Sequence, residues 1–145
     1  MKKMGDRMNK IYLIVMLVSL LLLTTGCIAN VQGQKITIQK QVESENNYED
    51  FKEVTNRKQV NKAKEIVENA DWEIAKVKMD RYADYQFQFP LKNSSQDKIA
   101  SYLLWVMPSG DNVEIVADSN KYVKLTEQDS ATLYEILTGE VLSQR

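Results

Sequence analysis

The sequence predicts an α+β domain in which two helices pack on one face of a small antiparallel, meandering sheet. Three observations lead to this fold class. Stretches of alternating apolar and polar residues, typical of strands with one wet face, recur between residues 35 and 125. Two stretches with helical spacing each begin behind a capping residue, one early and one at the end of the domain. The connections between the strands are short, which favours antiparallel neighbours.

The first strand is predicted at 35–42, where Ile36 and Ile38 alternate with polar residues. The acidic stretch 43–50 predicts a loop or a hairpin bend. The stretch 51–55 is predicted as a short second strand.

A helix is predicted over 57–70. Asn56 offers a side-chain oxygen to the free amides of the first turn, and Gln59 follows three residues later, as in a capping box. The apolar positions at helical spacing are Val60, Ala63, Ile66, Val67 and Ala70. We expect this stripe to face the core; the alternative is a groove-binding face for a partner.

Two strands are expected next. In 71–80 the apolar alternation slips by one residue between Ile74 and Val77, which predicts a strand with a bulge. The stretch 84–91 alternates cleanly, with Pro90 at a strand end or on an edge because it has no N–H to donate. Its apolar face holds Tyr85, Phe87, Phe89 and Leu91.

The stretch 99–107, which contains Trp105, is apolar on both faces and therefore predicts a central strand. The elements expected after it are a turn at 108–112, a strand at 113–117, a turn at 118–120 and a strand at 122–125. Thr126 then caps a closing helix, with Asp129 at the third position of the capping box. One side of this helix carries Leu133, Tyr134, Leu137 and Val141, and Gly139 indicates its end.

A lipoprotein signal peptide is predicted at 1–26. Four basic residues precede an apolar span at 11–23, whose thirteen residues are fewer than the roughly 20 that a membrane-spanning helix needs. The run Leu23-Thr24-Thr25-Gly26-Cys27 follows directly and reads as a lipobox. The thiol of Cys27 is therefore the predicted lipidation site. The alternative is an uncleaved anchor with an incidental cysteine.

Cleavage before Cys27 would place the mature protein on the outer face of the cell membrane, held by its lipid. The predicted organisation is a signal peptide at 1–26, a lipidated N-terminus and tether at 27–34, and one domain at 35–145. The start codon is open among Met1, Met4 and Met8.

Composition excludes several kinds of chemistry. Removal of the four basic residues and one acid before Cys27 leaves 15 basic and 19 acidic residues, a net charge of −4, which argues against a nucleic-acid partner. The chain has no histidine, and lipidation would consume its one cysteine. Ser–His and Cys–His catalysis and the usual zinc sites are therefore not expected. The five glycines are isolated, so no glycine-rich phosphate cradle is expected. No cofactor or metal site is predicted.

Most of the mature chain resembles a known family. The residues that carry the resemblance are Ala70-Asp71-Trp72, Tyr85-Gln86-Phe87, Tyr102-Leu103-Leu104-Trp105, Lys121-Tyr122-Val123-Lys124-Leu125 and Leu133-Tyr134. The stretch 48–139 that holds them is similar to the YhfM-like domain of small Gram-positive lipoproteins. The resemblance implies the same fold and location, and it brings no catalytic motif with it.

Three groups of side chains could carry chemistry. The acidic and amide residues Asp111, Asn112, Asp118 and Asn120 could hold a metal, although turn formation explains all four. The carboxylates Asp80, Asp84 and Glu114 could pair for acid–base work, although exposed strand faces carry such residues routinely. The aromatic residues Trp72, Tyr82, Tyr85, Trp105 and Tyr122 could form a sugar or peptide platform, although packing is the more common role.

We therefore expect a membrane-anchored extracytoplasmic domain that binds or senses a protein or small-molecule partner without catalysing a reaction. The main alternative is a carboxylate-dependent hydrolase or an enzyme accessory at the cell envelope. A third is a purely structural envelope protein, which a large exposed apolar patch would mark.

Overall fold

The computed structural model describes residues 35–42, 46–90 and 99–143. The chain divides into two compact units, Met1–Gly33 and Gln34–Arg145, and every described element belongs to the second. The predicted signal peptide, Cys27, the tether and Leu91 lie outside the described residues. None of the described helices is long and apolar enough to cross a membrane.

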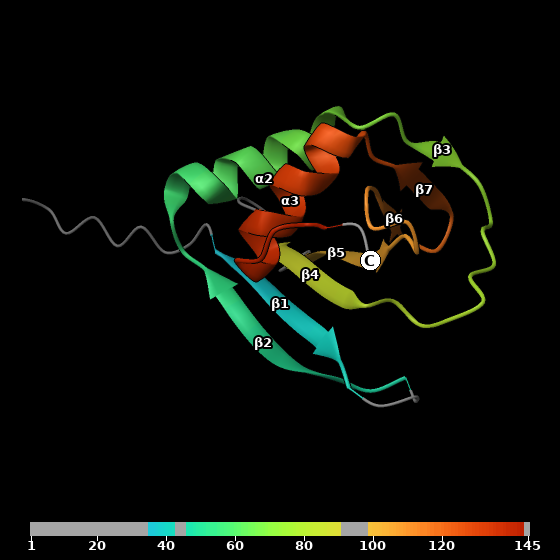
Figure 1. Cartoon of the computed structure of the whole chain (residues 1–145), viewed down its shortest axis with the longest axis horizontal. Helices are drawn as coiled ribbons and strands as arrows, with labels where there is room; N and C mark the ends of the chain where they lie inside the picture. The colour runs from blue at the N-terminus through green and yellow to red at the C-terminus, as the bar shows by residue number, and fades with distance from the viewer. Residues whose placement is uncertain (1–34, 43–45, 91–98, 144–145) are drawn as a thin grey trace, which may run out of the picture. The chain divides into compact units, whose positions relative to one another are not determined.

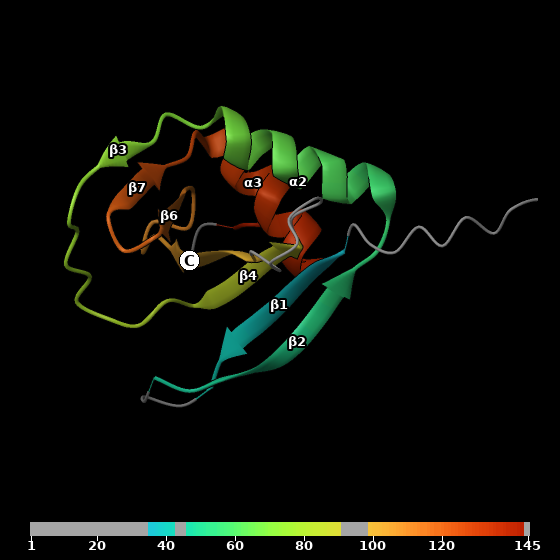
Figure 2. The same ribbon diagram turned by 180° about the vertical axis from the view of Figure 1, so that it is seen from behind.

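The described residues form a seven-stranded sheet in the order β2-β1-β4-β5-β6-β7-β3, with every neighbouring pair antiparallel. The strands are β1 Ile36–Gln41, β2 Tyr48–Val54, β3 Glu73–Ile74, β4 Tyr85–Pro90, β5 Ile99–Val106, β6 Val113–Ala117 and β7 Lys121–Lys124. The helices are α2 Arg57–Asn69 and α3 Glu127–Thr138. Figures 1 and 2 show both helices side by side over one face of the sheet, so the predicted α+β class is confirmed.

The core lies between this face and the helices. Antiparallel pairing aligns side chains of neighbouring strands into rows across the face. One row is Ile38, Phe87, Tyr102 and Ala117, and the next is Tyr85, Leu104, Ile115 and Val123. From the helices, Val60, Ala63, Ile66, Val67, Leu133, Ile136 and Leu137 are buried against these rows. The helix stripe predicted from the sequence is therefore part of the core.

Both helices begin at the predicted caps. The side chain of Asn56 accepts from the backbone N–H groups of Lys58 and Gln59 at 3.0 and 3.3 Å. The hydroxyl of Thr126 accepts from the N–H of Asp129 at 3.2 Å. Each bond satisfies a donor that the first turn leaves without a helical acceptor.

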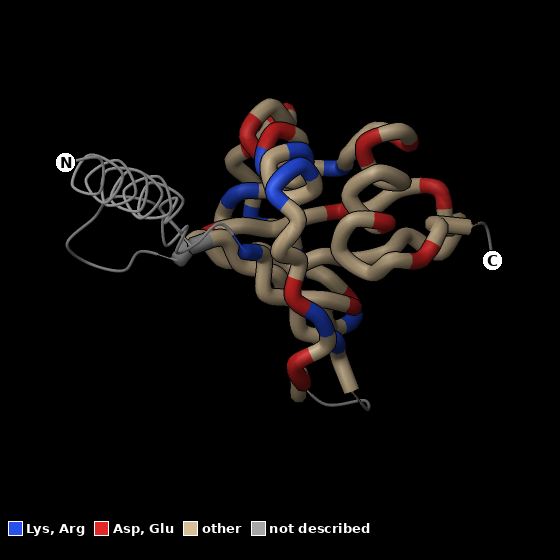
Figure 3. Tube along the Cα trace, turned by 90° about the vertical axis from the view of Figure 1, so that its left-hand side faces the viewer, with Lys and Arg blue, Asp and Glu red and all other residues tan. Residues whose placement is uncertain are grey.

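The outer face of α2 mixes both charges. Figure 3 shows basic and acidic positions interspersed along the described trace. Lys62 pairs with Glu65 at 3.2 Å and Lys64 with Glu68 at 3.7 Å. Exposed pairs at this spacing stabilise a helix by a few tenths of a kcal/mol each, about 0.2–0.5.

Strand β5 is central, as its apolar faces predict. It is fourth among the seven strands, with β4 and β6 as neighbours. Leu104 is fully buried under the helices, and Trp105, which points to the opposite face, is only 6% exposed. The cover on that opposite face comes from the segment that leads into β4, because the indole N–H of Trp105 donates to the carbonyl of Arg81 at 3.0 Å.

The prediction of a strand over 71–80 is wrong for most of this stretch. Only Glu73–Ile74 is a strand, paired with β7 at the edge of the sheet, and Ile74 is 87% exposed. The reason is the strand order. Since β4 lies between β1 and β5, the chain after β3 must leave the edge and travel to the middle of the sheet, so residues 75–84 cannot stay paired with β7.

Strand β2 also differs from the prediction, because it begins at Tyr48, inside the stretch expected to be a loop. Its register against β1 shifts between Ile38 and Gln39, which leaves Phe51 without a partner opposite. The acidic residues that predicted a loop before residue 51 are thus partly within the strand, which has a β-bulge at Phe51.

Candidate functional site

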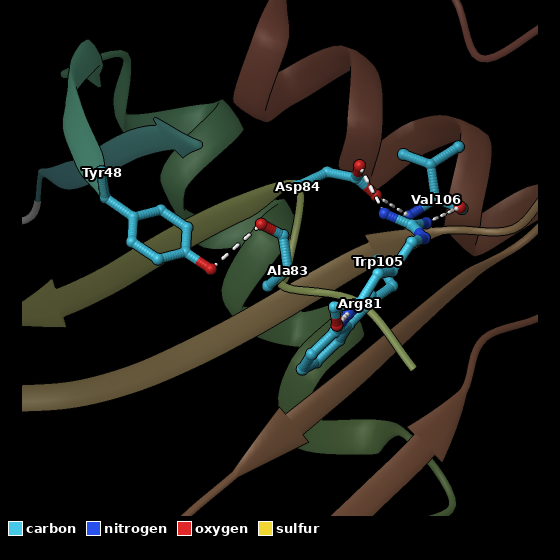
Figure 4. Close-up of polar contacts among 6 residues, drawn as sticks. All are labelled: Tyr48, Arg81, Ala83, Asp84, Trp105 and Val106. Atoms are coloured by element: carbon cyan, nitrogen blue, oxygen red, sulfur yellow. Dashed lines mark hydrogen bonds and ion pairs between the residues drawn. The ribbon is translucent and has the colours of Figure 1, made fainter. Parts of the chain in front are cut away.

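An Arg81–Asp84 ion pair joins the start of β4 to the end of β5 (Figure 4). Arg81 donates through Nη1 to Asp84 Oδ1 at 2.7 Å and through Nη2 to the carbonyl of Val106 at 2.6 Å. The N–H of Val106 donates to the other carboxylate oxygen, Oδ2, at 2.7 Å. Both oxygens of Asp84 are therefore occupied, and the guanidinium of Arg81 is held by two acceptors.

Two aromatic side chains fasten the segment that carries this pair. Trp105 donates to the carbonyl of Arg81, and the hydroxyl of Tyr48 donates to the carbonyl of Ala83 at 3.0 Å (Figure 4). Burial raises the pKa of Tyr48, so its hydroxyl stays a donor at neutral pH. The irregular chain before β4 is thus bonded to β2 and β5 although it has no strand partner.

A cleft of about 330 Å³ lies beside the ion pair, and we call it the end cleft. It lies among the ends of β1, β4 and β5 and the C-terminal end of α3. Its charged and phenolic residues outside the ion pair are Lys40, Tyr85, Tyr134 and Glu140, and its apolar wall is Val106, Met107 and Pro108. A volume at the small end of the usual range for ligand pockets suits a small molecule.

Lys40 contributes a positive charge at the rim of the end cleft. Its Nζ lies 5.4 Å from the ring centroid of Phe51 and 5.9 Å from that of Tyr85, within the range of cation–π attraction. Among the described residues, no carboxylate forms a salt bridge with Lys40. The ammonium group is thus positioned by aromatic rings, and its charge is not neutralised.

Tyr85 and Tyr134 form the phenolic part of the cleft. Both side chains are largely buried, and their rings meet edge to face with centroids 6.0 Å apart. Burial, followed by the hydrogen bond with Tyr134 and the charge of Glu140, raises the pKa of Tyr85 well above its usual value of 10.0. Its hydroxyl is therefore neutral at physiological pH and can donate and accept.

Glu140 supplies the negative charge of the cleft. It follows Gly139, which ends α3 in the left-handed conformation at φ +80°. The hydroxyl of Tyr134 donates to Glu140 Oε2 at 3.5 Å, and the N–H of Glu140 donates to Thr138 Oγ1 at 3.0 Å. The backbone of Glu140 is thus fixed at the end of α3, and no described basic residue forms a salt bridge with its exposed carboxylate.

The four residues considered for a metal are separately engaged in turns. Asp111 accepts from the hydroxyl of Ser109, and Asn112 donates to the carbonyl of Leu125 at 2.8 Å. Asp118 has φ 51° and pairs with Lys121 at 3.6 Å, and the carbonyl of Asn120 accepts from Ala75. Within the described part of the chain, no group of three or more acidic residues could hold a metal ion.

The carboxylates considered for acid–base work do not form one site. Asp84 belongs to the ion pair with Arg81, and Asp80 is exposed on the segment before it. Glu114 lies on β6 and accepts from Tyr122, whose pKa is raised to about 12 by burial and by this hydrogen bond. No hydrogen bond joins any two of the three carboxylates in the described structure.

The five aromatic residues considered for a platform are dispersed. Tyr85 and Trp105 are buried on opposite faces of the sheet. Trp72 packs against the core, with its ring centroid 6.1 Å from that of Tyr102. Tyr82 is 46% exposed, and Tyr122 is half-buried. Only Tyr85 lines the end cleft.

Sequence reasoning missed Lys40, Tyr134 and Glu140 as candidate ligand contacts. Tyr134 fell on the apolar side of its helix, which predicts packing. Lys40 and Glu140 are 100 positions apart, and no local motif connects them. The signal that could have pointed to Glu140 is its position directly after the predicted helix end at Gly139.

Comparison with protein-family models matches residues 29–142 to the model described as YhfM protein, a wider stretch than the 48–139 on which the resemblance was based. The chain is also similar to a thioesterase-like protein from Clostridium sporogenes ATCC 15579, known from a crystal structure at 1.70 Å. The two share 17% sequence identity with a TM-score of 0.49, over 72% of this chain and 93% of that one. A likeness at this level says nothing about activity. The search against curated proteins gives no match.

Proposed function

This chain belongs to the YhfM protein family, and we propose that it is a lipid-anchored extracytoplasmic domain that binds a small ligand in the end cleft without catalysing a reaction. One observation carries the proposal of binding. Arg81 and Asp84 neutralise each other, whereas Lys40 and Glu140 in the same cleft have no salt-bridge partner among the described residues. Positioned charges that face a cleft and not each other are available to a ligand.

The anchor part of the proposal rests on the sequence. The positive front end, the short apolar span and the Gly26-Cys27 junction are the features of a signal that ends in lipidation. Two acyl chains on one cysteine suffice for stable anchoring, whereas a single chain would be marginal.

The absence of catalysis is proposed from the side chains that line the cleft. No histidine exists in the chain, and the neutral phenol of Tyr85 is a poor base at physiological pH. Asp84 could act as a base or nucleophile only if it gave up its bonds to Arg81 and Val106. A carboxylate-dependent hydrolase remains the second candidate, because Asp84 and Glu140 line one cleft.

The two tryptophans allow a direct test of binding. Neither tryptophan lines the cleft, but Trp105 donates to the carbonyl of Arg81, which does line it, whereas Trp72 donates to Val67 of α2. In the full-length protein, purified in detergent and labelled with ¹⁵N-tryptophan, we expect the small-molecule ultrafiltrate of spent growth medium to shift the indole N–H signal of Trp105 and to leave that of Trp72 in place.

Mass spectrometry of the bound fraction separates the two candidate functions. Recovery of an unchanged ligand supports binding, and recovery of a hydrolysed product supports the hydrolase. If the Trp105 signal does not move, or if both signals move equally, the end cleft is not the binding site.

A further inference from the structure

The charges of the end cleft that have no salt-bridge partner are opposite in sign, and each lies beside aromatic side chains. Lys40 lies over the rings of Phe51 and Tyr85, the carboxylate of Glu140 accepts from Tyr134, and the backbone N–H of Glu140 donates to Thr138. Although both groups line one cleft, they do not reach the 4.0 Å of a salt bridge. Groups that are ordered before binding lose less conformational entropy when a ligand arrives.

This charge arrangement discriminates between classes of ligand. A simple anion attracted to Lys40 would be repelled by Glu140, and a simple cation attracted to Glu140 would be repelled by Lys40. A neutral sugar would leave both charges without a counter-charge. A molecule with a carboxylate and an ammonium group satisfies both at once.

The remaining lining indicates where the rest of the ligand lies. Val106, Met107 and Pro108 form one apolar wall, of which Val106 and Met107 are half-buried. The hydroxyl groups of Tyr85 and of Tyr134, which lies on α3, line the same cleft and can form hydrogen bonds. An apolar side chain on the wall would be shielded from water, while the charged end of the ligand stays at the rim.

We infer that the end cleft binds a zwitterionic α-amino acid with an apolar side chain. This inference rests on the proposed function. Its carboxylate pairs with Lys40, its ammonium group pairs with Glu140, and its side chain lies on the wall of Val106, Met107 and Pro108. A cleft of about 330 Å³ has room for one such molecule.

The test titrates L-leucine into the full-length protein in detergent and follows the Trp105 indole signal. The matched probes are L-leucinamide, which lacks the carboxylate, and N-acetyl-L-leucine, which lacks the ammonium group. We expect each to bind at least about tenfold more weakly than leucine, because each lacks one of the two charge-assisted contacts. Glycyl-leucine, whose two charges lie further apart, distinguishes a free amino acid from a peptide.

Variants assign each charge to its partner. Lys40→Gln should weaken leucine binding about tenfold but should not weaken leucinamide, because it removes a repulsion from that cation. Glu140→Gln should likewise weaken leucine binding but should not weaken N-acetyl-leucine, an anion. Lys62→Gln and Glu65→Gln, which change an ion pair on α2 away from the cleft, are the matched controls and should bind as the wild type does. An unchanged Trp72 signal in every variant shows that the fold is intact.

The outcomes separate this inference from the proposed function. If the ultrafiltrate shifts the Trp105 signal but leucine binds no better than its two analogues, the inference of a zwitterionic ligand is wrong and the proposed binding function stands. If glycyl-leucine binds more tightly than leucine, the ligand is a peptide and the inference of a free amino acid fails. If neither ultrafiltrate nor leucine shifts Trp105, both proposals fail.

Discussion

The indole N–H of Trp105 donates to the carbonyl of Arg81 at 3.0 Å and thereby ties the central strand to a segment without strand partners. The ring that makes this bond is only 6% exposed. Trp105 thus packs on the face of the sheet that the helices leave open, and it is bonded to the residue that pairs with Asp84. The same contact therefore contributes to packing and positions a residue of the candidate site.

Trp105→Ala should lower the free energy of unfolding by about 3–5 kcal/mol, because it deletes a large buried aromatic side chain. Trp105→Phe keeps a ring but leaves the Arg81 carbonyl without its donor, which should cost about 1–3 kcal/mol. Denaturant melts of the two variants measure both effects. A loss below about 1 kcal/mol for the alanine variant would place Trp105 on the surface.

Asp84→Asn should also destabilise the domain. The carboxylate accepts from Arg81 and from the N–H of Val106, and an amide group can offer an oxygen to only one of them. We expect a loss of about 1 kcal/mol in a denaturant melt, a modest value because the ion pair is partly exposed. The exposed Asp80 gives the control, since Asp80→Asn should change stability by less than about 0.5 kcal/mol. Equal effects of the two substitutions would contradict a structural role for the ion pair.

Gly139→Ala should destabilise α3 at its C-terminal end. Gly139 has φ +80°, which costs an L-residue about 1–2 kcal/mol, and an added Cβ would meet Lys52 Nζ at 3.2 Å. Gly139→Asn should lose less stability than Gly139→Ala, because asparagine tolerates the left-handed conformation better than alanine. Thermal melts of the two variants, compared in one buffer, give the order. The opposite order would show that the contact with Lys52, and not the backbone conformation, dominates.

We predict that the ionisation of Tyr122 lowers the stability of the domain at alkaline pH. Burial and the hydrogen bond with Glu114 raise its folded pKa to about 12 from 10.0, so the folded state holds this proton more tightly than the unfolded state. The resulting stabilisation is present in full below pH 10 and disappears as the pH rises from 10 to 12. Across this pH window, the free energy of unfolding should fall less steeply for Tyr122→Phe than for the wild type. Identical slopes would show that Tyr122 titrates normally.

The sequence predicted those parts of the fold that depend on neighbouring residues. Asn56 and Thr126 cap their helices because a cap needs only the following turn. Strand β5 was expected to be central because both of its faces are apolar over a single run. The same local reasoning failed at 75–80, which were predicted to continue a strand, because the course of this segment depends on the order of the strands in the sheet.

The end cleft could not be predicted for the same reason. Asp84 was considered as a catalytic acid, yet the N–H of Val106 that occupies one of its oxygens comes from 22 positions later. Lys40 and Glu140 belong to opposite ends of the domain, and only the placement of β1 beside β4 and of α3 above the sheet brings them to one cleft. Side-chain type was visible in the sequence, whereas the neighbours of each side chain were not.

The lipid is expected on Cys27, and this prediction decides where the end cleft works. Labelled palmitate should enter the wild-type protein in a bacterium with a lipoprotein pathway and should be absent from Cys27→Ala, because no other thiol exists to accept a diacylglyceryl group. Ser19→Ala, a change inside the apolar span, is the control and should leave labelling intact. The predicted tether of seven residues between Cys27 and the domain reaches at most about 25 Å, so a lipidated chain holds the domain close to the headgroups. If Cys27→Ala still incorporates the label, Cys27 is not the lipidation site. The proposal that the cleft binds ligands at the outer face of the cell membrane would then fail as well.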